Sequence, residues 1–300
     1  MTDLLALHPG RPVRSEVRRL ASALILDALE HLGRVESDLN PAIDRVCDLL
    51  TKGRALLRLV RFDIGERPYR TEDERLREVL RLIDPIHQSG RLIARAEILT
   101  EDEGDRLDRL QSGTLIARLE ARHLELAFAL AQSSVLGEVE AILRSSLLRI
   151  ERLPVASDDF ASLRSGFEQV AEQGLRRMLE ARQKPTGKRI FAWGRQVGFL
   201  SSHIRFLSNA WPQVLNPFAE ETGRLVRILG EDRELGHLAD VIRRDRSLTP
   251  KPLREPIAEL IGEARTRLLR EAWDLGARVH AEPPQHLAAR VGRIWMQGND

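Results

Sequence analysis

The chain has 300 residues, and 42% of them are hydrophobic, which is enough for a substantial core and too many for a disordered protein. It carries 47 Lys and Arg residues against 45 Asp and Glu residues. This balance argues against a protein that binds nucleic acid through a large excess of positive charge.

Apolar residues recur every three or four positions along most of the chain, and no sustained alternation indicates strands, so we predict an all-α protein. The first set of expected helices spans Ser15–Leu32, Pro41–Phe62, Thr71–Leu99, Asp102–Ala131 and Gly137–Arg152. The second set spans Asp159–Ala181, Thr186–Asn209, Pro212–Leu229, Glu231–Arg244, Lys251–Ala277 and Pro284–Met296. Long helices joined by short connections usually pack as antiparallel bundles.

The segment Leu153–Asp159 interrupts the helical periodicity near the middle of the chain. A weak internal repeat supports a division there, because aligning Asp44 with Phe191 superimposes apolar positions and pairs Arg58 with Arg205. We therefore expect an N-terminal extension, residues 1–14, followed by two tandem helical bundles, residues 15–152 and 153–300.

The cysteine content and the apolar runs bear on the compartment. Cys47 is the only cysteine, so no intrachain disulfide can form, and this fits a reducing compartment. The first residues lack the basic and long apolar regions of a secretion signal, and no apolar run reaches the length of a membrane span. We expect a soluble, cytoplasmic protein without a membrane partner.

Residue patterns typical of catalysis are not evident. The eight histidines are scattered singly and no HExxH occurs, so we expect no metal site. The sequence TGKR at 186–189 lacks the other residues of a phosphate-binding loop and is better interpreted as a helix start. Cys47 has no evident base partner. An enzyme is the least supported class, and no cofactor is expected.

The stretch AIDRVCDLLTKGRALLRLVR, residues 42–61, changes character along its length. Its second half carries basic residues, mostly at helical spacing: Lys52, Arg54, Arg58 and Arg61. Its first half places other residues along the same side: Asp44, Cys47, Asp48 and Thr51. The basic stripe has three readings, a solvated helix face, a residual anion site or a protein-contact surface.

The order and spacing of several stretches resemble the CHAD family, the conserved histidine α-helical domain. The stretches in the first half are residues 42–61 and LREVLRLIDPIHQSGRL, 76–92. Those in the second half are 184–215, LGEDRELGHLADVI at 229–242, and the tail PPQHLAARVGRIWMQ at 283–297. The resemblance implies two four-helix bundles related by a pseudo-twofold axis, with a central basic cavity that binds inorganic polyphosphate.

The chain departs from the family at the residues that bind the ligand. The family's naming histidines fall on Asp44 and Phe191, and several expected basic positions carry acids, among them Asp48, Glu168 and Glu172. The bases that remain, and that the resemblance assigns to a polyanion site, are Lys52, Arg54, Arg58, Arg176 and Arg195. We expect the helices 41–62 and 186–209 to face each other across this cavity, with Arg195 approaching the bases of the first half.

Two functions remain open at this point. The first is a non-enzymatic binding protein whose eroded cavity holds polyphosphate or another polyanion weakly, because acids in the cavity repel the ligand. The second is a helical bundle that has lost the ligand and docks a protein partner or forms a homodimer. No specific nucleic-acid partner is expected.

Overall fold

The computed structural model describes residues 5–102 and 109–298, and these residues form helices and connections without a strand. The helices of the N-terminal half are α1 (Val13–Leu32), α2 (Leu39–Leu59), α3 (Arg61–Ile64), α4 (Glu66–Asp102), α5 (Arg109–Gln132) and α6 (Val135–Ile150). Those of the C-terminal half are α7 (Ala161–Gln183), α8 (Gly187–Leu207), α9 (Pro212–Arg244), α10 (Arg254–Val279) and α11 (Pro284–Gln297), with short 3₁₀ turns at Ser208–Ala210 and Lys251–Leu253. The predicted all-α class is confirmed.

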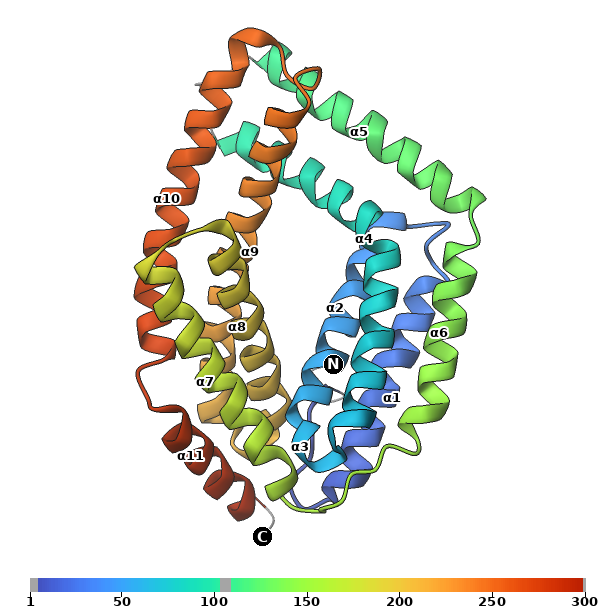
Figure 1. Ribbon diagram of the computed structural model, residues 1–300, viewed down its shortest axis with the longest axis vertical. Helices are drawn as coiled ribbons and strands as arrows, with labels where there is room; N and C mark the ends of the chain where they lie inside the picture. Colours follow the sequence, from blue (N-terminus) through green and yellow to red (C-terminus); the bar gives the residue numbers. More distant parts are fainter. Residues whose placement is uncertain (1–4, 103–108, 299–300) are drawn as a thin grey trace.

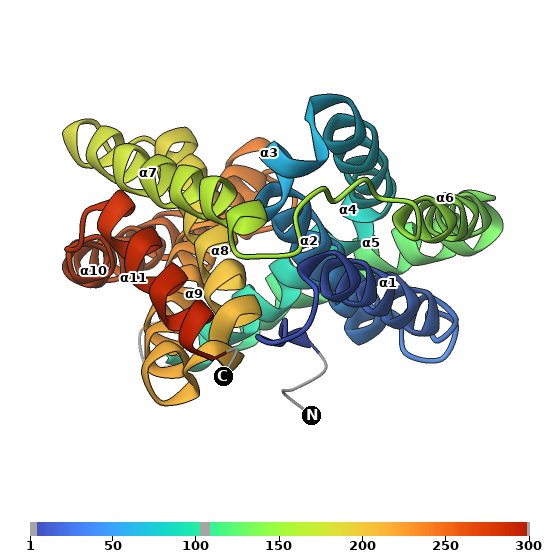
Figure 2. The ribbon, with the colours of Figure 1, turned by 90° about the horizontal axis from the view of Figure 1, so that it is seen from below.

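Helices that are close in the sequence form most of the packing (Figures 1 and 2). In the N-terminal half, α2 packs against α1 and α4, and α6 covers α1 and α4 from the outside. In the C-terminal half, α8 packs between α7 and α9, α10 runs along α9, and α11 lies against α7. The segment between α6 and α7 is non-helical, as the sequence predicts for Leu153–Asp159.

The two halves first meet where α7 and α8 pack against α2. Gly166 lets the backbones of α7 and α2 touch, because a Cβ atom at this position would lie 2.1 Å from the carbonyl oxygen of Leu59. Nearby, the fully buried His203 of α8 donates a hydrogen bond from Nε2 to the carbonyl oxygen of Ala55, at 2.8 Å. This contact belongs to the main apolar core, which is continuous across both halves.

A second apolar core joins the halves at their other end, where α4 and α5 meet α9 and α10 (Figure 1). Its residues are Leu92, Ala96, Leu99, Leu115, Leu119, Leu235, Leu238, Ile242, Leu248, Leu253, Ile257, Leu260 and Ile261. The halves therefore contact each other at two separated places.

Two helix boundaries differ from the sequence prediction. The expected break at Gly230 does not occur, and α9 is one continuous helix, because buried residues on both sides of the glycine pack against α8 and α10 and offset the roughly 1 kcal/mol that glycine costs in a helix. Helix α4 begins at Glu66 instead of Thr71, because Gly65, at φ 84°, ends α3 and Pro68 falls in the first turn of α4, where its missing N–H costs nothing.

The other helices follow the prediction to within a few residues. Thr186 caps α8, since its side chain accepts a hydrogen bond from the backbone N–H of Arg189 at 3.4 Å, so TGKR is a helix start as expected. The expected helix Asp102–Ala131 corresponds to α5, but its predicted beginning falls partly on residues 103–108, which lie outside the described residues.

The expected N-terminal extension packs onto the helices in its described part. Leu7 is fully buried and its N–H donates to the carbonyl oxygen of Phe206 at 2.7 Å. Glu16 of α1 accepts hydrogen bonds from His8 and Arg19. Burial acts to raise the pKa of Glu16, but these hydrogen bonds outweigh it and lower the pKa to about 2.

Candidate anion-binding site

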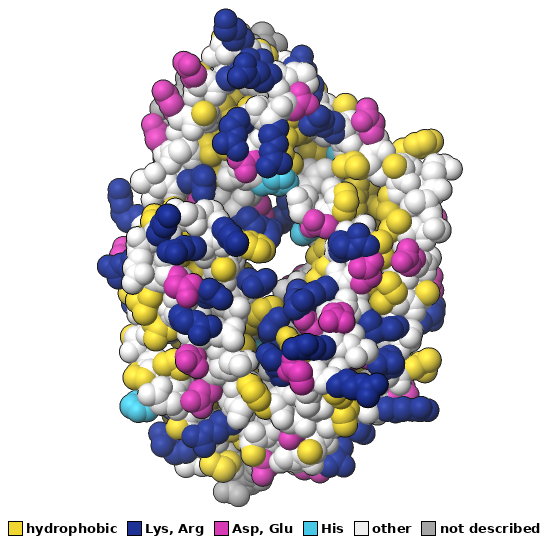
Figure 3. Space-filling view, in the orientation of Figure 1, with side chains coloured by type: hydrophobic (Ala, Val, Ile, Leu, Met, Phe, Trp, Pro, Cys, Tyr) yellow, Lys and Arg dark blue, Asp and Glu magenta, His cyan; other side chains and the backbone are white. Residues whose placement is uncertain are grey.

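The surface is hollowed between the two halves, with α2 and α4 on one side and α8 and α9 on the other (Figure 3). Lys and Arg side chains gather around this hollow, and Asp and Glu side chains lie among them (Figure 3). The hollow lies between the two places where the halves contact each other.

Two arginines of α2 converge on one buried carboxylate of α4. Arg54 and Arg58 are one turn apart, so they lie on the same face of α2, and their side chains are only 12% and 15% exposed. The Nε of Arg54 donates to Oδ1 of Asp73 at 2.8 Å, and a guanidinium nitrogen of Arg58 lies 3.9 Å from Oδ2 of Asp73. The carboxylate of Asp73 is 3% exposed.

A third arginine shares the same carboxylate. Arg77 follows Asp73 by one turn of α4, and its guanidinium lies 2.6 Å from Oδ2 of Asp73. Its side chain is 53% exposed, so it extends from the buried carboxylate to the solvent. One negative charge therefore serves three guanidinium groups.

Aromatic rings hold the two buried guanidinium groups in place. The Cζ atom of Arg58 lies 4.4 Å from the ring centre of Phe199, which comes from α8 in the other half, and 5.7 Å from that of Tyr69. Arg54 lies 6.0 Å from the same Phe199 ring. Cation–π contacts of this kind favour the charged form and fix the plane of the guanidinium. The Nε of Arg58 is buried without a hydrogen-bond partner among the described residues.

Arg195 of α8 brings a further positive charge from the C-terminal half. The protein around it partly removes water from its guanidinium group, which lowers its pKa from the ordinary arginine value. The positive charges of Arg54, Arg77 and Arg177 lower this pKa further, and Asp73 alone opposes them. Arg195 is exposed and forms no ion pair within the described part of the chain.

We call these five residues the arginine cluster: Arg54, Arg58, Arg77, Arg177 and Arg195. The carboxylates paired with them are Asp73 and Glu180, the latter 2.6 Å from Arg177. Five positive and two negative charges leave a formal charge of +3. Because guanidinium groups donate pairs of hydrogen bonds to phosphate and carboxylate oxygens, an anion would both relieve the repulsion and use the free donors.

The structure brings three of the five residues of the sequence-predicted site together and places the other two elsewhere. Arg54, Arg58 and Arg195 come together in the arginine cluster. Lys52 instead lies 2.7 Å from Asp48, one turn earlier on α2, and is 22% exposed. Arg176 is exposed on α7 and has no ion-pair partner in the described segments; its neighbour Arg177 is the residue of α7 whose charge acts on Arg195.

The acids expected in the cavity do not share one environment either. Asp44 lies 3.2 Å from His87 and 3.8 Å from Arg91, both on α4. Glu168 is half-buried and Glu172 exposed on α7, and neither forms an ion pair with a described residue. None of these acids pairs with the arginine cluster, whose carboxylate partners are Asp73 and Glu180.

A second set of ion pairs connects the halves on the opposite side of the hollow. Glu234 of α9, whose side chain is 7% exposed, accepts hydrogen bonds from Arg91 at 2.5 Å and from Arg95 at 2.8 Å, both on α4. Arg91 also approaches Asp44, and Arg95 lies 3.6 Å from Glu231. These arginines are paired with carboxylates, which leaves the arginine cluster as the positive part of the hollow with the larger excess of charge.

Sequence reasoning missed Asp73, Arg77 and Arg177. The sequence carries a signal for the first two, because an Asp followed four residues later by an Arg is a favourable helical pair. Nothing in the sequence shows that this pair is turned towards Arg54, since that depends on how α4 is rotated against α2.

The described residues show no arrangement typical of metal or thiol chemistry. No group of three or more His, Cys, Asp or Glu side chains among them is placed to hold a metal ion. Burial raises the pKa of Cys47 to about 12, and nearby Asp44 adds to the effect, so the thiol is protonated at neutral pH.

No protein-family model matches the chain, and no curated protein matches it significantly. No single helix of the described residues is long and apolar enough to cross a membrane, although one bent pair, Gly113–Gln132 with Val135–Ile150, meets the same length and composition criteria.

Proposed function

We propose that this chain is a non-enzymatic binding protein that holds inorganic polyphosphate, or a similar polyanion, at the arginine cluster. The observation that carries the proposal is the convergence of Arg54 and Arg77 from one half with Arg195 from the other, with Asp73 as their common counter-charge. We further propose that the two sets of helices are the two pseudo-twofold-related bundles of a divergent CHAD protein.

The charge of the cluster limits the affinity. Polyphosphate carries about one charge per unit, so a formal +3 supports about three phosphate contacts, and each contact contributes about 0.7–0.9 to the slope of log K against log salt. Three contacts predict a slope of about −2.1 to −2.7, and hence roughly 20- to 40-fold weaker binding at 200 mM than at 50 mM salt. Binding should be weak and strongly dependent on salt.

The direct test is Arg195→Gln, because this side chain is exposed and no described residue depends on it for an ion pair. Fluorescence anisotropy of end-labelled long-chain polyphosphate, titrated with the full chain at 50, 100 and 200 mM salt, gives the affinity and its salt slope. We expect the variant to bind roughly tenfold more weakly at 50 mM salt, with a slope shallower by about one contact.

The matched control is Arg144→Gln, which removes the same charge from an exposed ion pair with Glu140 on α6. This variant should bind like the original chain. Failure of the original chain to bind polyphosphate at 50 mM salt, or an equal loss of binding in both variants, would refute the proposed site.

A protein-contact function is the second candidate, because α5 exposes large apolar side chains one turn apart. Leu124 is 67% exposed and Phe128 is 69% exposed, and together they form an exposed apolar face. If this face mediates homodimer formation, light scattering should show a dimer that the double variant Leu124→Ser, Phe128→Ser converts to a monomer. A monomeric original chain would refute it.

A further inference from the structure

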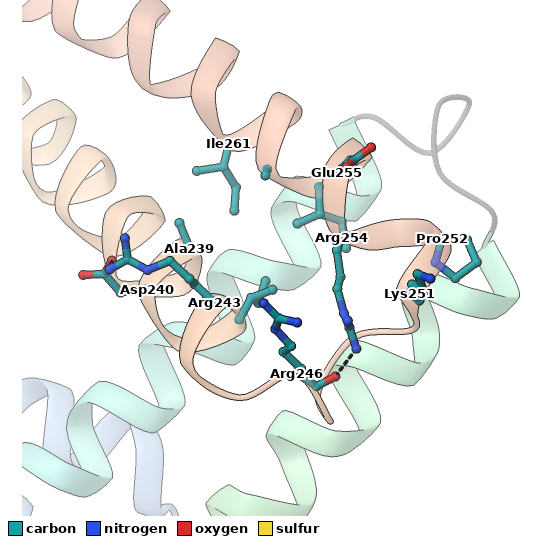
Figure 4. A pocket seen from close by; sticks show the side chains of 12 residues that line it. Ala239, Asp240, Arg243, Arg246, Lys251, Pro252, Arg254, Glu255 and Ile261 are labelled. Carbon is teal, nitrogen blue, oxygen red and sulfur yellow. Dashed lines mark hydrogen bonds and ion pairs between the residues drawn. The ribbon is translucent and has the colours of Figure 1, made fainter.

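An open pocket lies far from the arginine cluster, at the end of the molecule where α9 turns into α10 (Figures 1 and 4). Its volume is about 740 Å³, within the range of pockets that hold small organic molecules. Its apolar lining includes the exposed Pro252 and Ala258, and beneath them lie Ile242 of α9 and Ile257 and Ile261 of α10, which are buried in the second apolar core.

Basic side chains surround this apolar lining. They come from the end of α9, the connection and the start of α10: Arg243, Arg246, Lys251 and Arg254. Two acids also contribute, but Asp240 is paired with Arg243 at 2.8 Å, and Glu255 points out of the pocket in Figure 4. The pocket therefore combines an apolar floor with a net positive rim.

The basic residues divide into fixed and available groups. Arg254 donates to the backbone carbonyl oxygens of Thr249 at 3.2 Å and Arg246 at 2.7 Å, so it holds the connection in place. Arg246 and Lys251 are exposed and form no ion pair in the described part of the chain. Figure 4 shows the guanidinium group of Arg246 reaching into the space between α9 and α10.

We propose that this pocket binds a small amphipathic anion, a carboxylate with an unbranched apolar tail, independently of the polyanion site. The tail lies along Pro252 and Ala258, above the three isoleucines, and the carboxylate takes the hydrogen bonds of Arg246 and Lys251. The two helix ends at the pocket oppose each other electrostatically, because the N-terminus of α10 favours an anion and the C-terminus of α9 disfavours it. The preference for an anion thus comes from the basic side chains.

A polyanion fits this pocket less well than an amphipathic molecule. A chain of phosphates would cover the apolar lining with charged groups and remove their water without compensation. A single charged head with an apolar tail matches both parts of the pocket, since the tail removes apolar surface from water and the head stays at the solvent-exposed rim.

Displacement of the fluorescent fatty acid 11-(dansylamino)undecanoate from the full chain tests the proposal. Decanoate should displace this probe at least tenfold more effectively than decanol, which has the same tail without the charge. Octanoate should be roughly four- to fifteenfold weaker than decanoate, because each buried methylene contributes about two- to fourfold. Equal displacement by decanol and decanoate would overturn the proposal.

Two variants separate the rim from the floor. The rim variant, Arg246→Gln with Lys251→Gln, should weaken decanoate binding roughly tenfold. Its control, Arg182→Gln with Lys184→Gln, makes an equal charge change on two exposed residues at the end of α7 and should leave decanoate binding unchanged. Ala258→Trp, at an exposed position of the lining, should block the probe. Unaltered binding in the rim variant or in Ala258→Trp would overturn the assignment.

A measurement on the unmodified chain guards against variants that fold poorly. In methyl NMR spectra of isoleucine-labelled protein, decanoate should shift the signals of Ile257 and Ile261 and leave that of Ile43, in the main core, in place. Shifts spread over both cores, or none at all, would show that decanoate does not occupy this pocket.

Discussion

The substitution Asp73→Asn tests the central idea of the proposed site, that one buried carboxylate occupies the place of an external anion. Asp73 accepts hydrogen bonds or close charge contacts from Arg54, Arg58 and Arg77 and is almost completely buried. Breaking a buried ion pair by removing one partner costs about 3–5 kcal/mol. Since a chain of this size loses roughly 2–4 °C per kcal/mol, the melting temperature should fall by roughly 6–20 °C.

The same substitution should strengthen anion binding. An anion bound at about 6 Å from Asp73 is repelled by about 0.7–2.8 kcal/mol at effective dielectric constants of 80 to 20. Removing this charge predicts an affinity for polyphosphate that is roughly 3- to 100-fold higher. Because a ligand present at 100 times its Kd adds about 2.7 kcal/mol to the stability, polyphosphate should raise the melting temperature of the variant more than that of the original chain.

The assay is thermal unfolding at 50 mM salt with and without long-chain polyphosphate, at matched sodium concentration. Asp48→Asn is the control, because it removes the same charge from an ion pair on α2, with Lys52, that lies outside the cluster. Asp48→Asn should neither lower the melting temperature as much nor gain more from polyphosphate. The reasoning fails if polyphosphate stabilises the two variants equally, or if Asp73→Asn melts like the original chain.

Three further predictions concern α7, the packing of the halves and pH. Arg177→Gln should weaken polyphosphate binding, measured by anisotropy, by about three- to tenfold, whereas Arg176→Gln should leave it unchanged. A larger loss of binding in Arg176→Gln than in Arg177→Gln would place Arg176 at the site. Gly166→Ala should destabilise the protein by roughly 1–3 kcal/mol or more in urea unfolding, because its Cβ would meet the backbone of α2. Gly198→Ala is the control and should be neutral or stabilising, because no atom lies within 4 Å of the added Cβ. Equal effects of the two substitutions would contradict the close contact at Gly166. Burial lowers the pKa of His203 to about 4, below its ordinary value of 6.5. Between these pH values the unfolded chain takes up a proton that the folded chain does not. The free energy of unfolding should therefore fall by about 3 kcal/mol from this residue as the pH drops from 6.5 to 4. His203→Gln should flatten that part of the stability–pH curve and His286→Gln, at an exposed position, should not; an unchanged curve in His203→Gln would show that this histidine is not buried in its neutral form.

The helices could be predicted from the sequence because periodic burial is a local property. One failure occurred where a local signal was weaker than tertiary packing, and the other where a proline lies at a helix start. Gly230 indicates a break only if neighbouring helices do not hold the chain, and α9 is held on both sides. Pro68 indicates a break only in the interior of a helix, whereas it lies in the first turn of α4.

The candidate site could be predicted in part, and helical geometry explains which part. Arg54 and Arg58 are four residues apart, which is about 40° around a helix, so they share a face. Lys52 is two residues from Arg54, about 200° around the helix, and it lies in a different direction, next to Asp48. This distinction was available from spacing alone.

The contribution of the second half depended on tertiary structure. Arg195 meets Arg54 only because α8 packs against α2, and the choice of Arg177 over Arg176 follows from a rotation of about 100° on α7. Asp73 was the hardest residue to predict, because an acid on a charged stretch of sequence gives no indication of burial. In the fold it is buried next to three arginines, Arg54, Arg58 and Arg77.

Arg54 and Arg58, the two buried members of the arginine cluster, are held in place without a ligand, and this bears on what would limit the affinity. On one side of the hollow, Gly166 and His203 fix α7 and α8 against α2; on the other, Glu234 joins α9 to α4. Arg54 and Arg58 are further fixed by Phe199 of the opposite half, so an incoming anion pays little to order them. The remaining cost is electrostatic, because Asp73 already neutralises part of the positive charge. We therefore expect the affinity for an anion to be limited by this carboxylate rather than by the arrangement of the helices.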